Sequence, residues 1–540
     1  MLRAVHVHGS PDGPWFFLLA QSDPRSRECR LVGITDTSML RPQVFAIQRG
    51  DAAVGLAASE KQAIDASLES LSEADGRFWS RADLYWSARG GSHTDGGAFA
   101  FTVRRGGEAE PELVCTDKFG RRIEPDPSKR PPPTLAPARR GGEGARLLGG
   151  GEGAEELFAH VVAQLPTFGY AQLSEILGEL ERAAWDDAAR ERAIAIVTLL
   201  MDRRYATGAL KRSAILTLLD RSLAVLVDAI RRSPSPRYAW VGCEEPLPDA
   251  RGATAVVDAR GFASEGPRSL SRALVALHRR GFRRFLVANV RGQRFIGCGL
   301  GPGSAGVHVD VYGAAGDYLG SGIDGGEIIV HGSAQDQLAQ ILKDGKLVVH
   351  GDVGQTFLYA AKGGQVFVLG NAAGRPLINA VGRPRAVING TCLDYLAESF
   401  MAGDPLQGGG FAIVNGVAFD EDGGLADLDN PYPGGNLFSL ASGGAIYMRD
   451  PRRRVGEDQL NGGEIVPLGD DDWKLIRPYL EENERLFGIP LARLLSIDGR
   501  ALAPGAAYRK IRPSAHGALL PEEAWVNRED TQPRAAASNP

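Results

Sequence analysis

A short apolar run that ends in glycine recurs along the middle of the chain, and it constrains the fold more than any other feature. Six copies end at Gly313, Gly332, Gly351, Gly370, Gly390 and Gly416, so successive copies lie 19, 19, 19, 20 and 26 residues apart. A fixed period of about 20 residues is typical of a solenoid, in which each repeat packs on its neighbours in the stack.

Each run predicts a short β-strand. Leu347-Val348-Val349 is too short for a helix and rich in β-branched residues. The glycine that follows permits a tight turn that a side chain would obstruct. One turn of chain per 19 residues allows about two or three short strands, and turns stacked at about 4.8 Å would align Val, Leu and Ile side chains into an apolar interior. The sequence therefore predicts a right-handed parallel β-helix over residues 235–416, entered through a strand–helix–strand cap.

Four segments of this region carry a family resemblance: RGQRFIGCGLG (291–301), SGIDGG (321–326), VVHGDVGQTFLYAAKGG (348–364) and VLGNAAGRPLINA (368–380). They resemble the Gly-rich (GXGXG) domain at the C-terminus of the large (alpha) subunit of glutamate synthase. The same domain forms one subunit of formylmethanofuran dehydrogenase and of the related formyltransferase/hydrolase complex. The resemblance implies the β-helix fold, but one fold serves many reactions, so it does not imply a reaction.

Residues 1–125 resemble part of a class II glutamine amidotransferase, the α+β domain that begins glutamate synthase. The similar order is Asp36, then Leu40-Arg41-Pro42, a hairpin, and a helix that starts at Ser59. In that family the nucleophile is an N-terminal cysteine whose own amine is the base. Here residue 2 is Leu, and an Asn-Gly oxyanion element is missing before Asp36. We therefore expect no glutaminase nucleophile in this chain.

A glycine-rich stretch, YWSARGGSHTDGGAFAF (85–101), is the best candidate for a polar site. Paired glycines bracket Ser92-His93-Thr94-Asp95, so His93, Thr94 and Asp95, with Arg41, could bind an anion, an amide or a partner. The alternative is a hairpin whose turn Asp95 stabilises. The sequence leaves both interpretations open, and it predicts no catalytic residue, no cofactor site and no metal site.

The rest of the chain divides by composition. Residues 126–153 are rich in Pro and then Gly, which predicts a linker. Apolar residues at three- and four-residue spacing predict a helical segment over 154–234. Residues 417–515 predict a helix and strand extension, and 516–540 have no periodic pattern and are expected to be disordered. The predicted fold class is thus multi-domain: a β-helix, an N-terminal α+β amidotransferase-like domain and a helical segment.

Charge and cysteine content indicate the class of partner and the cellular compartment that we expect. The net charge of −5 gives no overall attraction to nucleic acid or to anionic membranes. The five cysteines are 55 or more residues apart, without the spacing of a zinc or iron–sulfur site. No signal peptide and no apolar stretch of about 18 residues is evident. These features predict a cytoplasmic protein with no nucleic-acid or membrane partner.

The resemblance also indicates what is missing. Glutamate synthase carries out its chemistry in a central barrel that binds FMN and an iron–sulfur cluster, and this chain has neither the clustered cysteines nor a run of β/α units. We therefore expect a non-catalytic accessory or scaffold component of glutamate biosynthesis and nitrogen metabolism. It would dock a separate catalytic subunit of an oxidoreductase complex, and FMN and the cluster would lie in that partner.

Two alternatives remain. The chain could be the scaffold subunit of a formylmethanofuran dehydrogenase or formyltransferase/hydrolase complex. It could also be an enzyme with a cleft along the solenoid, as in carbohydrate-active β-helices, but such clefts need paired carboxylates and aromatic platforms. Trp is absent between residues 307 and 416.

Overall fold

The computed structural model describes residues 153–514 apart from 185–186, 251 and 421–422, together with the backbone of strands in the first 123 residues. Those N-terminal strands form an antiparallel sheet in the order β1-β2-β3-β6-β7-β8 and a separate β4-β5 hairpin. Their bounds are Leu2–His8 (β1), Trp15–Ser22 (β2), Cys29–Ile34 (β3), Ala46–Arg49 (β4), Ala52–Gly55 (β5), Phe99–Arg104 (β6), Glu112–Asp117 (β7) and Arg122–Ile123 (β8).

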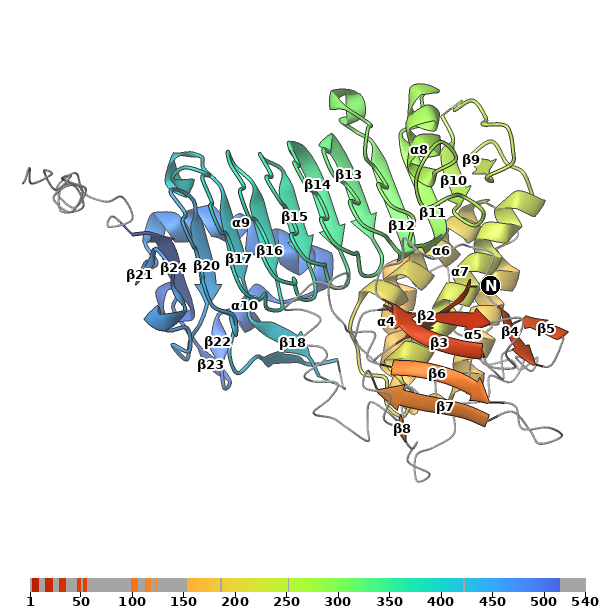
Figure 1. Cartoon of the computed structure of the whole chain (residues 1–540), viewed down its shortest axis with the longest axis horizontal. Coiled ribbons are helices and arrows are strands. Elements are labelled where there is room, and N and C mark those ends of the chain that lie inside the picture. Colours follow the sequence, from red (N-terminus) through yellow and green to blue (C-terminus); the bar gives the residue numbers. More distant parts are fainter. Residues whose placement is uncertain are drawn as a thin grey trace, which may run out of the picture.

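A twelve-stranded sheet organises the remainder, in the order β21-β24-β20-β17-β16-β15-β14-β13-β12-β11-β10-β9 (Figure 1). Strands β9 to β20 run parallel, and β24 and β21 add antiparallel at one edge. The strands are β9 (Tyr238–Val241), β10 (Thr254–Asp258), β11 (Arg284–Arg291), β12 (His308–Ala314), β13 (Asp324–Val330), β14 (Asp344–Val349), β15 (Gln365–Val368), β16 (Arg385–Ile388), β17 (Phe411–Val414), β20 (Ala445–Arg449), β21 (Gly463–Pro467) and β24 (Tyr508–Pro513).

The described helices flank this sheet. They are α4 (Ala154–Gln164), α5 (Tyr170–Ala183), α6 (Asp187–Asp202), α7 (Arg212–Arg232), α8 (Leu270–Arg279), α9 (Asp470–Phe487), α10 (Leu491–Leu494) and α11 (Pro504–Ala507). Two small antiparallel pairs, β18 (Val417–Phe419) with β19 (Leu425–Asp427) and β22 (Ser496–Ile497) with β23 (Arg500–Ala501), complete the described elements outside the 3₁₀ turns.

The predicted β-helix was wrong as a fold class. The sequence predicted turns built from two or three strands each, whereas the regular strands of the repeats form one sheet, with one strand from each repeat, in an α/β arrangement with flanking helices. The sheet also continues beyond residue 416 through β20, β24 and β21. The predicted α+β amidotransferase-like domain falls on residues of which only the strand backbones are described.

The segments that lead from the end of one sheet strand to the start of the next, which we call return segments, explain the difference. Alternate residues there have a positive φ, for example 56° at Gln337, 54° at Ala339 and 56° at Ile341. A pleated strand needs negative φ at every residue, so these segments cannot pleat. They still stack on one another through backbone hydrogen bonds, such as Gln337 N to Gln355 O at 2.8 Å. In the first repeats the same places hold glycines, including Gly297 at φ 79°.

The two faces of the sheet are covered differently. The inner face packs on the return segments and α8; its buried side chains include Val309, Val330 and Val349, which cluster with Leu338 of a return segment. The outer face is covered by two groups of helices (Figure 1). Helices α4 to α7 pack on β10 to β12, and α9 packs on β14 to β20. The two groups meet over β12 to β14, and the side chains at this junction are polar.

Apolar spacing along the helices fits this arrangement. In α6, Ala193, Ile196, Val197 and Leu200 recur at three- and four-residue intervals and are at most 2% exposed. Helix α9 has three acidic residues in its first turn and ends at Gly488, which has a φ of 70°. Helices α6 and α9 therefore each bury an apolar stripe against the outer face of the sheet.

Candidate functional site

The polar residues at the junction occupy neighbouring positions of successive repeats, and we call this group the seam. Strand register pairs His308 with Glu327 and Glu327 with Lys346. About four residues further along the same strands, His331 and His350 follow the last residues of β13 and β14, and the ring of His331 stacks on Tyr312 of β12. The seam consists of His308, Asp310, Glu327, His331, Lys346 and His350, with Asp202 from α6.

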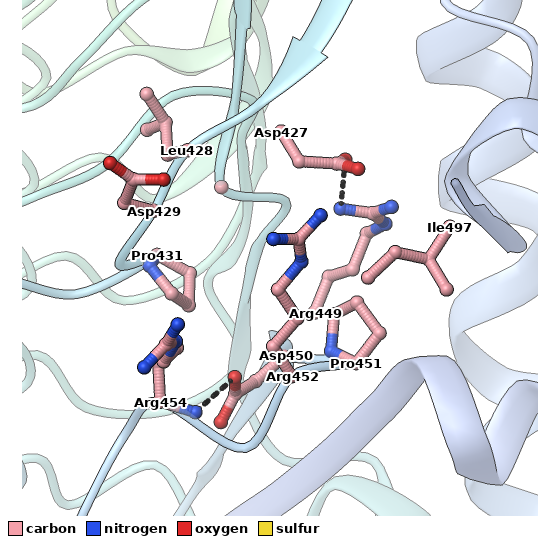
Figure 2. Close-up of a pocket in the computed structure, with 11 residues that line it drawn as sticks. Asp427, Leu428, Asp429, Pro431, Arg449, Asp450, Pro451, Arg452, Arg454 and Ile497 are labelled. Carbon is pink, nitrogen blue, oxygen red and sulfur yellow. Dashed lines mark hydrogen bonds and ion pairs between the residues drawn. The ribbon is translucent and has the colours of Figure 1, made fainter.

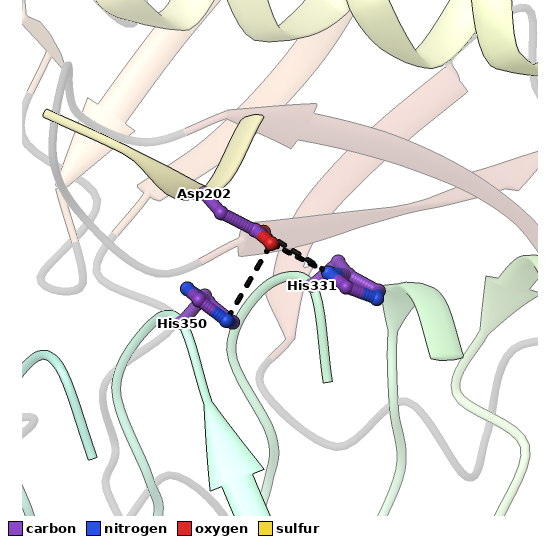
Figure 3. A group of neighbouring side chains, drawn as sticks. All are labelled: Asp202, His331 and His350. Carbon is purple, nitrogen blue, oxygen red and sulfur yellow. Dashed lines mark hydrogen bonds and ion pairs between the residues drawn. The ribbon is translucent and has the colours of Figure 1, made fainter. Parts of the chain in front are cut away.

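Asp202 joins the helical layer to the seam. It is the last residue of α6, where a carboxylate faces the negative end of the helix dipole and needs a compensating cation. Its Oδ2 lies 2.8 Å from Nδ1 of His331 and 3.5 Å from Nε2 of His350 (Figure 3). The side chains of all three residues are 9% exposed or less. One possible ligand atom from each residue, an imidazole nitrogen or a carboxylate oxygen, lies within 4.8 Å of those of the other two.

A chain of alternating charges continues from this cluster. His331 Nε2 lies 3.1 Å from Asp310 Oδ1, and the other oxygen of Asp310 lies 3.1 Å from Nε2 of His308. Nδ1 of His308 is 3.0 Å from Glu327. Lys346 then pairs with Glu327 at 3.7 Å and also contacts Glu482 of α9. The chain of ion pairs thus runs from α6 across the sheet to α9.

Their pKa values show which groups are charged. Burial by itself would lower the pKa of His331, but Asp202 and Asp310 raise it more, to about 10. Hydrogen bonds to Asp310 and Glu327 raise the pKa of His308 to about 9. Burial opposes ionisation of Asp310, yet His308 and His331 hold its pKa below the usual range. At neutral pH both histidines are cations between carboxylates.

His350 differs from the other two histidines. Burial lowers its pKa to about 4, and Arg203 and Arg204 oppose a second positive charge beside His331. Its Nδ1 is buried without a hydrogen-bond partner. The ring centroids of His350 and His331 are 5.7 Å apart in a stacked arrangement. The ring centroids of His350 and Phe487 are 5.1 Å apart in an edge-to-face arrangement. It is a neutral imidazole in a polar cluster with one ring nitrogen unsatisfied.

Further along the same edge of the sheet, the side chains that follow the strands of later repeats are amides. Asn389 and Asn415 are fully buried, and Nδ2 of Asn415 donates to Oδ1 of Asn389 at 2.8 Å. Asn389 also exchanges hydrogen bonds with Asn483 of α9, and Tyr508 donates to Asn415 at 2.9 Å. These amides are fully paired, so they fix α9 to the sheet and leave no free group for a ligand.

A second polar region is a shallow pocket of about 250 Å³, part of it open to solvent, at the far end of the sheet (Figure 2). Its buried Arg449 pairs with Asp427 at 2.8 Å and donates to backbone oxygens of Leu494 and Ser496. Arg452, which also lines the pocket, pairs with Asp498 at 2.8 Å. Because the charges of Arg449 and Arg452 are already paired, these two side chains give the pocket little attraction for an anion.

Two of the thiols are unreactive. Burial raises the pKa of Cys298 to about 12 and moves that of Cys392 higher still. A thiol that stays protonated at neutral pH is a poor nucleophile. Cys243, which is half-buried, completes the free cysteines among the described residues.

The predicted site residues lie elsewhere in the chain. Arg41, His93, Thr94 and Asp95 fall outside the described residues, so their hypothesis stays a prediction. The seam was missed, although the sequence contained a signal for it. IIVHG and LVVHG place His331 and His350 at the same position of consecutive repeats, 19 residues apart. In the part of the chain that the structure describes, none of the helices combines the length and apolar character needed to cross a bilayer.

Comparison with known protein families identifies one domain. The family model described as "GXGXG motif" matches residues 288–496, which span β12 to β20, α9 and the seam residues of the sheet, but not Asp202. No curated protein matches the chain. Residues 297–301 read G-x-G-x-G, and Gly297 and Gly299 have φ of 79° and 80° at the first return segment. Residues 288–496 therefore form a GXGXG motif domain, the kind found in the large subunits of glutamate synthase.

Proposed function

We propose that this chain is a non-catalytic scaffold component of a glutamate-synthase-like assembly, which docks a separate subunit that carries FMN and an iron–sulfur cluster. The observation that carries the proposal is the GXGXG domain at residues 288–496, which is typical of glutamate-synthase-like proteins. In this chain it is joined to a helical layer at the seam.

The chemistry of the described residues supports a scaffold. His308 and His331 are each held between two carboxylates, so neither is free to act as a general base. Cys298 and Cys392 are protonated at neutral pH because they are buried. These two histidines and two thiols therefore suit a role in holding the layers together better than a role in catalysis.

The return segments supply a surface for a partner. Ile341 and Leu440 are 39% and 77% exposed, and Met401 is 50% exposed. A ladder of backbone hydrogen bonds places Ile341 and Leu440 at the same position of different repeats. Exposed large apolar side chains on a rigid framework are common at protein–protein contacts. The surface that we propose for docking is therefore the outer edge of the return segments.

The test is purification of the tagged full chain from its native host, with mass spectrometry of the eluate and an absorbance scan for flavin. The expected result is a stoichiometric partner that contains flavin and an iron–sulfur cluster and synthesises glutamate. A Leu440→Asp variant should reduce the recovered partner at least several-fold, because a charge would be buried on docking. Arg272→Glu, a change of charge on α8, is the matched control and should leave recovery unchanged.

Three results would refute the proposal. The chain could elute alone, it could elute with subunits of a formyl-transferring complex, or the purified chain could by itself release ammonia from glutamine. The second result would favour the alternative assembly that shares this domain. Circular dichroism of Leu440→Asp is needed beside the recovery, and because Leu440 is 77% exposed the variant should fold normally.

A further inference from the structure

The cluster at the seam has the composition of a metal site. We propose that Asp202, His331 and His350 bind one divalent transition-metal ion of the zinc type, which clamps α6 to the sheet at β13 and β14. The ligands would be a carboxylate oxygen, Nδ1 of His331 and Nε2 of His350 (Figure 3). This inference is independent of the scaffold proposal, because it concerns contacts within the chain.

The distances suit such an ion. Zinc binds imidazole nitrogen and carboxylate oxygen at about 2.0–2.2 Å in tetrahedral geometry, which separates neighbouring ligand atoms by roughly 3.4 Å. The Asp202 oxygen lies 2.8 Å from His331 Nδ1 and 3.5 Å from His350 Nε2. All three donors fall within 4.8 Å of one another, so shifts of about an ångström would complete the triangle around a metal.

A second observation points to a missing partner. His350 has a side chain that is 7% exposed, its Nδ1 has no hydrogen-bond partner, and its Nε2 approaches Asp202 only to 3.5 Å. A contact of 3.5 Å is at the outer limit of a hydrogen bond, so Nε2 has only a weak interaction inside the buried cluster. A metal ion bound to Nε2 would replace that weak contact with a strong bond, and Nδ1 would then carry the proton of the neutral imidazole.

The neighbours already resemble the surroundings of a metal ligand. Without the ion, His331 carries a proton on each ring nitrogen; the ion would displace the Nδ1 proton to solvent, while Nε2, 3.1 Å from Asp310, keeps donating to that carboxylate. Carboxylates that hold the second nitrogen of a histidine ligand orient the ring and strengthen its donation. Asp202 and Asp310 provide two negative charges, and His308 and Glu327 extend the chain beyond Asp310.

Other charges near the cluster limit which ion can bind. Arg203 and Arg204 follow α6 and oppose additional positive charge near His350. The ion must therefore gain enough from nitrogen ligands to offset this repulsion. Two imidazoles and one carboxylate favour zinc, cobalt or nickel over magnesium and calcium, which prefer oxygen ligands. Three protein ligands leave a fourth position for water in a tetrahedral complex.

The experiment uses the full chain, stripped with a chelator and incubated with zinc chloride, cobalt chloride or magnesium chloride. After gel filtration, elemental analysis should find about one zinc per chain and no retained magnesium. His350→Gln should weaken zinc binding at least ten-fold, because it removes one of the two nitrogen ligands among three protein ligands. His278→Gln, on α8 outside the cluster, is the matched control and should bind zinc like the wild type.

A spectrum of the cobalt form of the wild-type protein provides a second readout that needs no variant to fold. Intense visible bands of four-coordinate cobalt are expected, and added zinc should abolish them. The inference is overturned if the wild type retains no zinc, if magnesium competes equally, if His350→Gln binds zinc as tightly as wild type, or if cobalt shows only the weak spectrum of its hydrated ion.

Discussion

Asp202 is the residue whose removal tests the seam most directly. Asp202→Asn keeps the shape of the side chain but removes the negative charge that lies 2.8 Å from the buried His331 cation. Removing one partner of a buried ion pair typically costs about 3–5 kcal/mol. We expect about 3 kcal/mol, the lower end of that range, because Asp310 still pairs with His331 at 3.1 Å.

Hydrogen exchange of chelator-treated protein measures this cost locally, which matters because a chain of this size need not unfold in one step. A loss of about 3 kcal/mol should make hydrogen exchange on the order of 100-fold faster at those amides of α6 and β13 that open together. Asp228→Asn is the matched control. Its partner Arg260 is 3.2 Å away with a half-exposed side chain, so the change should be under about 1 kcal/mol.

The result that would refute the reasoning is unchanged exchange in α6 and β13 of Asp202→Asn. It would mean that apolar packing under α6, from residues such as Ile196 and Leu200, holds the helix without help from the ion pair. A uniform rise in exchange across α9 as well as α6 would equally contradict a local role, because the far end of the sheet has its own amide network.

Three further predictions follow from particular contacts. The pKa of His331 is raised from 6.5 to about 10, so its stabilising contribution is complete below pH 6.5 and is lost as the pH rises toward 10. Urea unfolding of the chelator-treated protein should therefore show stability falling by up to about 1.4 kcal/mol per pH unit above neutrality, and His331→Asn should flatten that slope. Gly345→Ala should destabilise by about 3 kcal/mol or more, because φ is 102° and a Cβ would lie 2.3 Å from the Gly326 oxygen; a thermal shift of less than 2 °C would contradict this. Asn389→Ala should cost about 2–3 kcal/mol by leaving Asn483 with an unsatisfied buried amide, and α9 amides that exchange as slowly as in wild type would disprove it.

Residue types along the chain determined where the strands form. The apolar runs before Gly332 and Gly351 became β13 and β14, because β-branched residues favour extended backbone and the register keeps like positions together. The same repeat placed His331 and His350 side by side, and a reader of the sequence could have predicted that pair from IIVHG and LVVHG. Strand positions and this pair are local or periodic properties, which a sequence carries directly.

Only the tertiary structure determined the conformation of the return segments and the position of Asp202. Whether a return segment pleats depends on residues such as Leu358 and Leu377, which have φ of 59° and 62° although leucine disfavours that region. Only the stack of neighbouring repeats stabilises such a backbone, so the sequence predicted additional strands where the structure has none. Asp202 stands 129 residues before His331, and no period links them. The cluster forms because α6 ends over the sheet, and that position is set by packing of whole layers.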